Sequence, residues 1–129
     1  MKATTTTLLT LSTFAYLGLC DIGLATTYKP PYLPTKCFGG DKGQFPAYNL
    51  FGAVGPTLWD GGGACGRKYE VRCITGEGGT GKCKGGSVTI KVVQGRLGDR
   101  APQLSLSVAA AQRIYTGSGT FKAEFVVVN

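Results

Sequence analysis

Alternating apolar and polar side chains mark the clearest strand of the chain, residues 67–73. In an extended segment successive side chains point to opposite faces, so this pattern predicts a half-buried strand. The residues of one face are Arg67, Tyr69, Val71 and Cys73, and those of the other are Lys68, Glu70 and Arg72. The glycines at 61–63 precede this strand and favour a sharp turn, because glycine adopts positive φ at little cost.

Further patterns predict more strands and one helix. The other predicted strands are residues 24–28, 87–93 and 121–128. Residues 108–114 predict the helix, because apolar side chains recur there at helical spacing after Ser107, a candidate N-cap. Residues 38–63, rich in glycine and aromatic side chains, are interpreted as a loop region, and residues 94–102 as polar turns. Short strands with one helix favour a small β-barrel over a sandwich.

The N-terminus has the features of a secretory signal. Lys2 supplies a positive charge, and Leu8 to Leu19 is an apolar run shorter than the roughly 20 residues that span a bilayer. We therefore predict a signal peptide over residues 1–20, a secreted protein, and no integral membrane segment. Two sites with small residues compete for cleavage, one after Cys20 and one after Ala25.

Residues 21–129 are then expected to form one domain, stapled by disulfides because secretion leads to an oxidising compartment. The four cysteines beyond the signal are Cys37, Cys65, Cys73 and Cys83. Four cysteines allow three disulfide pairings, and their spacing does not determine which pairing forms.

The chain is basic, with 14 Lys and Arg against 7 Asp and Glu. Without Lys2 the net charge is about +6, which would draw the protein to acidic polysaccharide or anionic cell surfaces. A net charge of this size is also explained by solubility alone, and composition does not distinguish this role from binding of an anionic partner. Export argues against nucleic acid as a partner, and we expect a monomer.

The residue types present restrict the available chemistry. The chain has no His, which excludes Ser–His and Cys–His catalysis and His-based zinc sites. We expect no metal and no cofactor. Carboxylates remain for acid–base work, and Asp60, between Trp59 and the glycine turn, has neighbours that suit a cleft. The alternative is an ordinary turn residue, because Asp before Gly is a common turn signal.

Several motifs together resemble the plant natriuretic peptide-like proteins, which are secreted single-domain relatives of the expansin N-terminal domain. The most specific is the block of Trp59, Asp60, Gly61, Gly62, Gly63, Ala64, Cys65 and Gly66, followed by Cys73. The others are residues 23–32, 37–39, 83–88 and 104–107. The resemblance covers nearly all of the chain beyond the signal.

The resemblance implies a mainly β fold, a six-stranded double-psi β-barrel with one short helix, related to the family 45 endoglucanases. It implies the pairing Cys37–Cys65 and Cys73–Cys83, and it favours cleavage before Asp21, since the later site would cut into the first strand. It also implies a non-enzymatic apoplastic protein with a role in water and solute homeostasis or in stress and defence responses.

Two departures from the family pattern bear on activity. Gln94 stands where relatives usually have Asp, and Ser105 stands where the enzymes and expansins have an acidic residue. A serine hydroxyl cannot act as a general acid near neutral pH, because its pKa is far too high. We therefore predict that the protein is not an enzyme and has no catalytic residue.

Two functions remain, a signalling protein that contacts a cell-surface receptor and, as the alternative, a module that binds cell-wall polysaccharide. A glycan-cleaving enzyme that relies on Asp60 alone is a third, weaker hypothesis. The candidate contact residues are Tyr48, Phe51, Trp59, Asp60, Lys68 and Arg72. For the aromatic residues among them the alternative is a place in the barrel core.

Overall fold

The computed structural model of the chain describes residues 20–77 and 81–128. The predicted signal peptide therefore lies outside the described residues, Cys20 excepted. The strands are β1 (Asp21–Tyr28), β2 (Phe51–Val54), β3 (Lys68–Gly76), β4 (Val88–Gly95), β5 (Leu104–Ser107) and β6 (Phe121–Val128). Two α-helices are α2 (Pro56–Trp59) and α3 (Val108–Ile114). Within the described part of the chain, no helix combines the length and apolarity needed to cross a bilayer.

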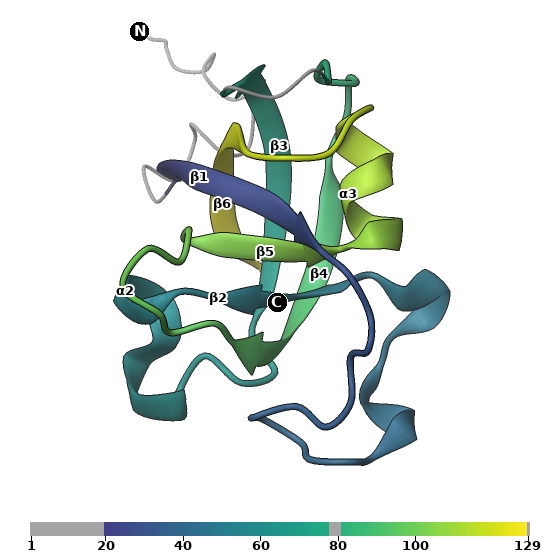
Figure 1. Ribbon diagram of the computed structural model, residues 1–129, viewed down its shortest axis with the longest axis vertical. Coiled ribbons are helices and arrows are strands. Elements are labelled where there is room, and N and C mark those ends of the chain that lie inside the picture. The colour runs from purple at the N-terminus through teal and green to yellow at the C-terminus, as the bar shows by residue number, and fades with distance from the viewer. Residues whose placement is uncertain (1–19, 78–80, 129) are drawn as a thin grey trace, which may run out of the picture.

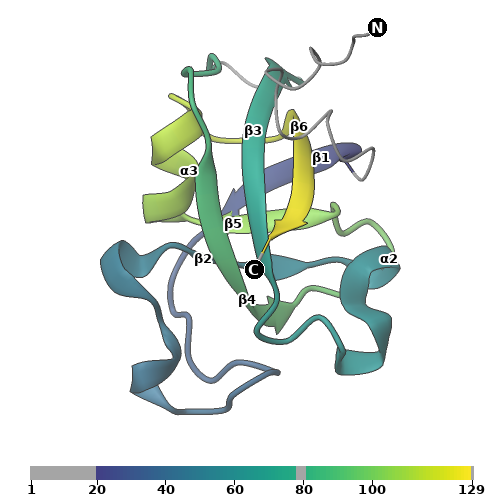
Figure 2. The same cartoon turned by 180° about the vertical axis from the view of Figure 1, so that it is seen from behind.

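The six strands close into a barrel in the order β1-β5-β2-β4-β3-β6. In Figure 1, β1, β5 and β2 lie in front, and Figure 2 shows β3, β4 and β6 from the other side. Two neighbouring pairs, β1 with β5 and β2 with β4, are parallel, and the other pairs are antiparallel. The predicted mainly β fold, a closed six-stranded barrel with a short helix, is confirmed.

The barrel interior is filled by one face of each strand. On β3 the buried residues are Tyr69 and Val71, whereas Lys68 and Arg72 are exposed, as the alternation predicts. The Tyr69 ring packs edge-on against Phe125 of β6, with ring centroids 5.7 Å apart. This arrangement brings β3 and β6 together along their length and leaves the opposite face of β3 in solvent.

The interpretation of residues 38–63 as a loop region is wrong in part, since this segment contains β2 and the short helix α2. All four residues of β2 are buried, and so are all four of β5. Strand β2, which reads Phe-Gly-Ala-Val, shows no alternation of apolar and polar residues, as is usual for a strand covered on both faces. Strand β5 alternates Leu and Ser, but its serines are buried as well and do not mark an exposed face. At Gly52 a Cβ atom would lie 2.8 Å from the carbonyl oxygen of Ser105, so glycine permits the close approach of β2 to β5.

Helix α3 occupies the predicted residues and begins at the predicted cap. The Ser107 hydroxyl accepts a hydrogen bond from the backbone N–H of Ala110 at 3.1 Å and donates one to the carbonyl oxygen of Asn49 at 2.7 Å. Because a helix of 7 residues is not stable alone, it depends on this cap and on burial of its apolar side against the barrel. The buried residues are Ala110, Ala111 and Ile114.

Two disulfides staple the fold, Cys37–Cys65 and Cys73–Cys83, the pairing that the resemblance implies. The first disulfide joins cysteines that are 28 positions apart along the chain, and the second joins cysteines that are 10 positions apart. By the loop-closure model each stabilises the folded state by about 3 to 4 kcal/mol. The first disulfide attaches the long segment between β1 and β2 to the turn before β3.

We expect Ser107→Ala to lower the free energy of unfolding by about 1–2 kcal/mol, because it removes the cap of α3 and leaves buried polar groups unpaired. Urea unfolding with the disulfides intact measures the change. Ser118→Ala is the matched control, since Ser118 is exposed, and it should shift stability by less than about 0.5 kcal/mol. Equal effects of the two substitutions would contradict the role of the cap.

Candidate functional site

Four side chains form a row across the outer face of four neighbouring strands. Ala53 of β2 is in register with Gln94 of β4 and with Ser105 of β5, and Ser105 is in register with Thr26 of β1. The residues on either side of Ser105 belong to the barrel core, so Ser105 faces outward. Residues far apart in the sequence, including both departures from the family pattern, thus meet on one face.

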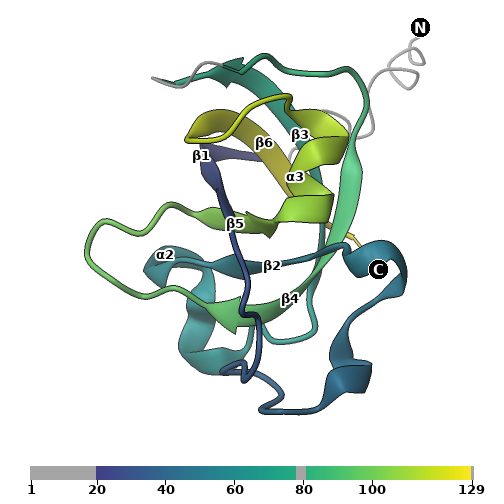
Figure 3. The ribbon, with the colours of Figure 1, turned by 45° about the vertical axis from the view of Figure 1, so that its right-hand side comes forward.

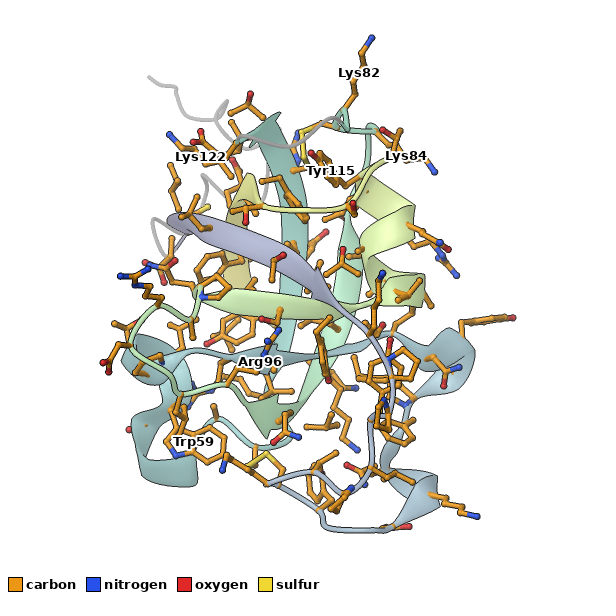
Figure 4. All side chains as sticks on the ribbon, viewed as in Figure 1. Trp59, Lys82, Lys84, Arg96, Tyr115 and Lys122 are labelled. Carbon is orange, nitrogen blue, oxygen red and sulfur yellow. A yellow bond between two sulfur atoms is a disulfide. The ribbon has the colours of Figure 1, made fainter. Side chains whose placement is uncertain are left out.

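Two open hollows lie on this face and meet at Arg96. The first has a volume of about 460 Å³, and its polar lining comes from Tyr28, Thr35, Lys36, Gln94 and Arg96. The second has a volume of about 550 Å³, and its polar lining comes from Thr26, Thr27, Arg96 and Arg100. Figure 3 shows the loop between β4 and β5, which carries Arg96 and Arg100, projecting from the barrel. In Figure 4 Arg96 lies over β5 and β2. Together the hollows form a groove, defined here by these lining residues.

Tyr28 and Arg96 make the centre of this groove. The Arg96 guanidinium carbon lies 5.7 Å from the centroid of the Tyr28 ring, within the range of a cation–π interaction. Burial raises the pKa of Tyr28, the neighbouring Tyr32 adds to the rise, and Arg96 acts in the opposite direction. Tyr28 is therefore a neutral phenol at physiological pH, and its buried hydroxyl has no hydrogen-bond partner among the described residues.

The two positions that depart from the family pattern, 94 and 105, carry neutral side chains. The Gln94 side-chain oxygen accepts hydrogen bonds from the backbone N–H of Lys36 at 2.9 Å and of Gly95 at 3.1 Å. Gln94 thereby ties the segment after β1 to the end of β4. Ser105 is 1% exposed, and its hydroxyl is unpaired within the described part of the protein. Neither group supplies a proton or a negative charge near neutral pH.

The prediction of Phe51 as a contact residue is wrong. Phe51 is 1% exposed and packs against Tyr32 and Phe45, with ring centroids 4.8 and 4.5 Å apart. Trp59 is half-buried against the barrel core, and a Cβ atom on Gly95 would lie 2.8 Å from its ring. For these two aromatic residues the structure therefore supports the alternative, a place in the packing of the barrel.

Asp60 has the features of the alternative that it is a turn residue. It adopts φ 56°, its carbonyl oxygen accepts a hydrogen bond from the Gly63 N–H at 2.8 Å, and its carboxylate pairs with Arg67 at 3.3 Å. Its side chain is 69% exposed. A catalytic acid of the glycosidase type is placed in a shielded, apolar pocket, and Asp60 has no such surroundings.

The remaining candidate contact residues lie on the surface. Tyr48 is 78% exposed, Arg113 lies over its ring at 5.7 Å, and Tyr48 and Lys68 line a hollow of about 220 Å³ together with Lys91. Arg72 is exposed further along β3. The structure therefore brings Tyr48 and Lys68 together, but it does not place them in the groove.

Sequence reasoning did not select Tyr28, Lys36, Arg96 or Arg100. The available signal was indirect, because the departures at Gln94 and Ser105 did not show that both residues lie on the outer face next to the groove. Among residues 20–77 and 81–128, no three His, Cys, Asp or Glu side chains are grouped closely enough to hold a metal ion.

Comparison with known proteins gives the following similarities. No family model matches the chain. An EG45-like domain containing protein of Citrus jambhiri is 30% identical over 125 residues, which cover 95% of this chain and 90% of that protein. EG45-like domain containing protein 2 of Arabidopsis thaliana is 39% identical over 72 residues, covering 55% of this chain and 52% of that protein.

Among solved structures, the ligand-free expansin of Clavibacter michiganensis matches with a TM-score of 0.65 and 22% identity, over 86% of this chain. A mutant of that expansin in complex with cellohexaose matches with a TM-score of 0.63 and 24% identity. The matched part is 51% of each expansin chain, so this chain corresponds to about half of that protein. The match confirms the double-psi β-barrel fold.

We expect Gly95→Ala to destabilise the protein by about 1–3 kcal/mol, because the new methyl group would overlap the Trp59 ring. Trp59 is the only tryptophan, so intrinsic fluorescence during urea unfolding reports both the stability and the displaced ring. Gly98→Ala is the control in the same segment, since a Cβ atom there meets nothing within 4 Å. An unchanged unfolding midpoint for Gly95→Ala would refute this packing.

Proposed function

The chain belongs to the family of EG45-like domain containing proteins, and from this premise we propose that it is a secreted, non-enzymatic protein that binds polysaccharide of the plant cell wall. The observation that carries the proposal is the groove itself, which is lined by Lys36, Gln94, Arg96 and Arg100 and by no carboxylate of the described residues. The expansin fold, described for one bacterial expansin in complex with cellohexaose, supports a glycan as the ligand.

The groove residues favour binding without cleavage. Hydrolysis of a glycosidic bond ordinarily uses two carboxyl groups that flank the bond. Among the described residues, no Asp or Glu lines either hollow, and Gln94 is the one of the two departures from the family pattern that lines a hollow. Asp60, in its exposed turn, is paired with Arg67 and does not line the groove.

The polar lining suits a ligand that is rich in hydroxyl groups. The groove offers cationic donors, Lys36, Arg96 and Arg100, whose N–H groups can bond the hydroxyl oxygens of a sugar chain. The hydroxyls of Thr26 and Thr35 are bonded within the protein, to the Gly119 carbonyl oxygen at 3.1 Å and to Gln44 Oε1 at 2.7 Å, and those of Thr27 and Tyr28 are buried.

A receptor-directed signal of the natriuretic peptide type, with a role in water and solute homeostasis or stress responses, is the second candidate. The observation that favours it is the hollow lined by Tyr48 and Lys68, which lies outside the groove and exposes an aromatic ring beside a positive charge. Exposed aromatic residues are enriched at protein interfaces.

The start of β1 supports the earlier of the two cleavage sites. Residues Asp21 to Ala25 form the whole of the pairing between β1 and β6, and cleavage after Ala25 would remove it. We expect the secreted protein to begin at Asp21, and mass spectrometry of its N-terminus measures this. A start at Thr26 would contradict the expectation.

We expect the secreted domain to be retained by wall fractions without releasing reducing ends, because the groove holds no acid pair. Retention on wall fractions and binding to bare protoplasts should be measured side by side, with reducing-sugar release as the readout of cleavage. Asp60→Ala should leave retention unchanged.

Three results would contradict this proposal in different ways. Release of reducing ends that is lost in Asp60→Ala would make the protein an enzyme. Saturable protoplast binding without wall retention would favour the signalling candidate. Absence of both wall retention and protoplast binding would contradict both candidate functions.

A further inference from the structure

The groove carries positive charge and no negative charge among the residues that line it. Its charged residues are Lys36, Arg96 and Arg100, which come from two segments of the chain. The segment 96–103 has one carboxylate, Asp99, which is exposed and does not line either hollow. A groove lined by charge of one sign concentrates ligands of the opposite sign.

The charges in the groove have no internal counter-charge. Within the described residues, no carboxylate forms an ion pair with Lys36, Arg96 or Arg100. The recorded side-chain contact of Arg96 is with the Tyr28 ring, which leaves the hydrogen-bonding edge of its guanidinium unoccupied. The backbone N–H of Arg96 donates to the carbonyl oxygen of Val54 at 2.9 Å, so the base of this side chain is fixed to the barrel.

The groove also lacks an open aromatic face on which a neutral sugar ring could stack. Tyr28 is the one aromatic residue that lines either hollow, and Arg96 lies over its ring. Trp59 packs against Gly95 and does not line the groove. Charge and hydrogen bonding, rather than ring stacking, are therefore the means by which this groove can select a ligand.

We propose that the groove recognises the carboxylate groups of an acidic, uronic-acid polysaccharide, with Arg96 at the centre and Lys36 and Arg100 in the two hollows. The proposal rests on the polysaccharide-binding function proposed above and names its ligand class. The planar guanidinium of Arg96 presents paired N–H groups that match the two oxygens of a carboxylate. Arg96 belongs to both hollows, so a chain that occupies both would pass this residue.

The test compares ligands that differ in charge or in the chemistry of the backbone. Polygalacturonate oligomers, the same oligomers fully methyl-esterified, cellohexaose and poly-glutamate are titrated against the mature, disulfide-bonded protein by calorimetry. We expect polygalacturonate to bind about tenfold or more tightly than its methyl ester, because esterification removes every carboxylate charge. Binding should weaken between about 20 and 200 mM salt, because exposed charges are screened.

Substitutions in the groove locate the contact. Arg96→Gln should weaken polygalacturonate binding about three- to tenfold, and Arg100→Gln should weaken it by a smaller factor, as for exposed charge pairs. The double substitution Lys82→Gln and Lys84→Gln is the control, because it removes two exposed charges at the end of the barrel away from Arg96, as Figure 4 shows. It should change binding by less than about twofold. Thermal unfolding of each variant verifies that it is folded, and Arg100→Gln, in an exposed loop, tests the site if Arg96→Gln does not fold.

The outcomes separate this inference from the proposed function. Equal binding of polygalacturonate, its methyl ester and cellohexaose would overturn the acidic ligand and leave polysaccharide binding intact. Binding of poly-glutamate as tight as that of polygalacturonate would overturn selection of a polysaccharide. An effect of the Lys82 and Lys84 control as large as that of Arg96→Gln would show that net charge, not the groove, attracts the ligand. Absence of binding to every glycan would overturn both proposals.

Discussion

Burial of β2 and β5 on both faces is the constraint on which the rest of this structure depends. The inner faces of these two four-residue strands complete the barrel core, so their outer faces need a cover from elsewhere in the chain. The segment between β1 and β2 supplies it, with Tyr32 and Phe45 packed on Phe51. The disulfide Cys37–Cys65 holds this segment in place, which explains why a barrel with such short central strands carries a staple there.

The groove is the part of the outer face that this cover leaves open. Thr26 and Gln94, at the two ends of the outward row, line it, and the loop that carries Arg96 forms its rim, whereas Ser105 and Ala53 between them are buried. A carboxylate at the position of Ser105, which is 1% exposed, would incur a large desolvation cost unless a cation compensated it. A neutral hydroxyl avoids that cost. Among the described residues no carboxylate lines the groove, so its charge is positive.

Net charge alone would not have shown this arrangement. The basic residues are scattered along the sequence and form no run, and the composition fits both solubility and an anionic partner. Closure of the barrel places the end of β4 beside the end of β1 and so gathers Lys36, Arg96 and Arg100 around one groove. The three-dimensional distribution of charge, not its sum, favours the anionic ligand.

The sequence by itself determined the elements with a clear period and one-sided burial. These are β3, β4, β6 and helix α3 with its Ser107 cap, because each shows its apolar face in the spacing of its residues. Strand β1 is predicted only from residue 24, and its residues Ile22 and Leu24 are exposed whereas Ala25 is buried. The pattern of short strands favoured a small barrel, and the resemblance added its six-stranded double-psi topology and the disulfide pairing. Tertiary structure decided the rest. Strand β2 carries no alternation, the serines of β5 are buried, and Phe51 packs against Tyr32 and Phe45 of the preceding segment. The groove joins residues of β1 and β4 with residues of the segments that follow them. Local pattern encodes which side of a segment meets the core, but contacts between distant segments depend on how the barrel closes.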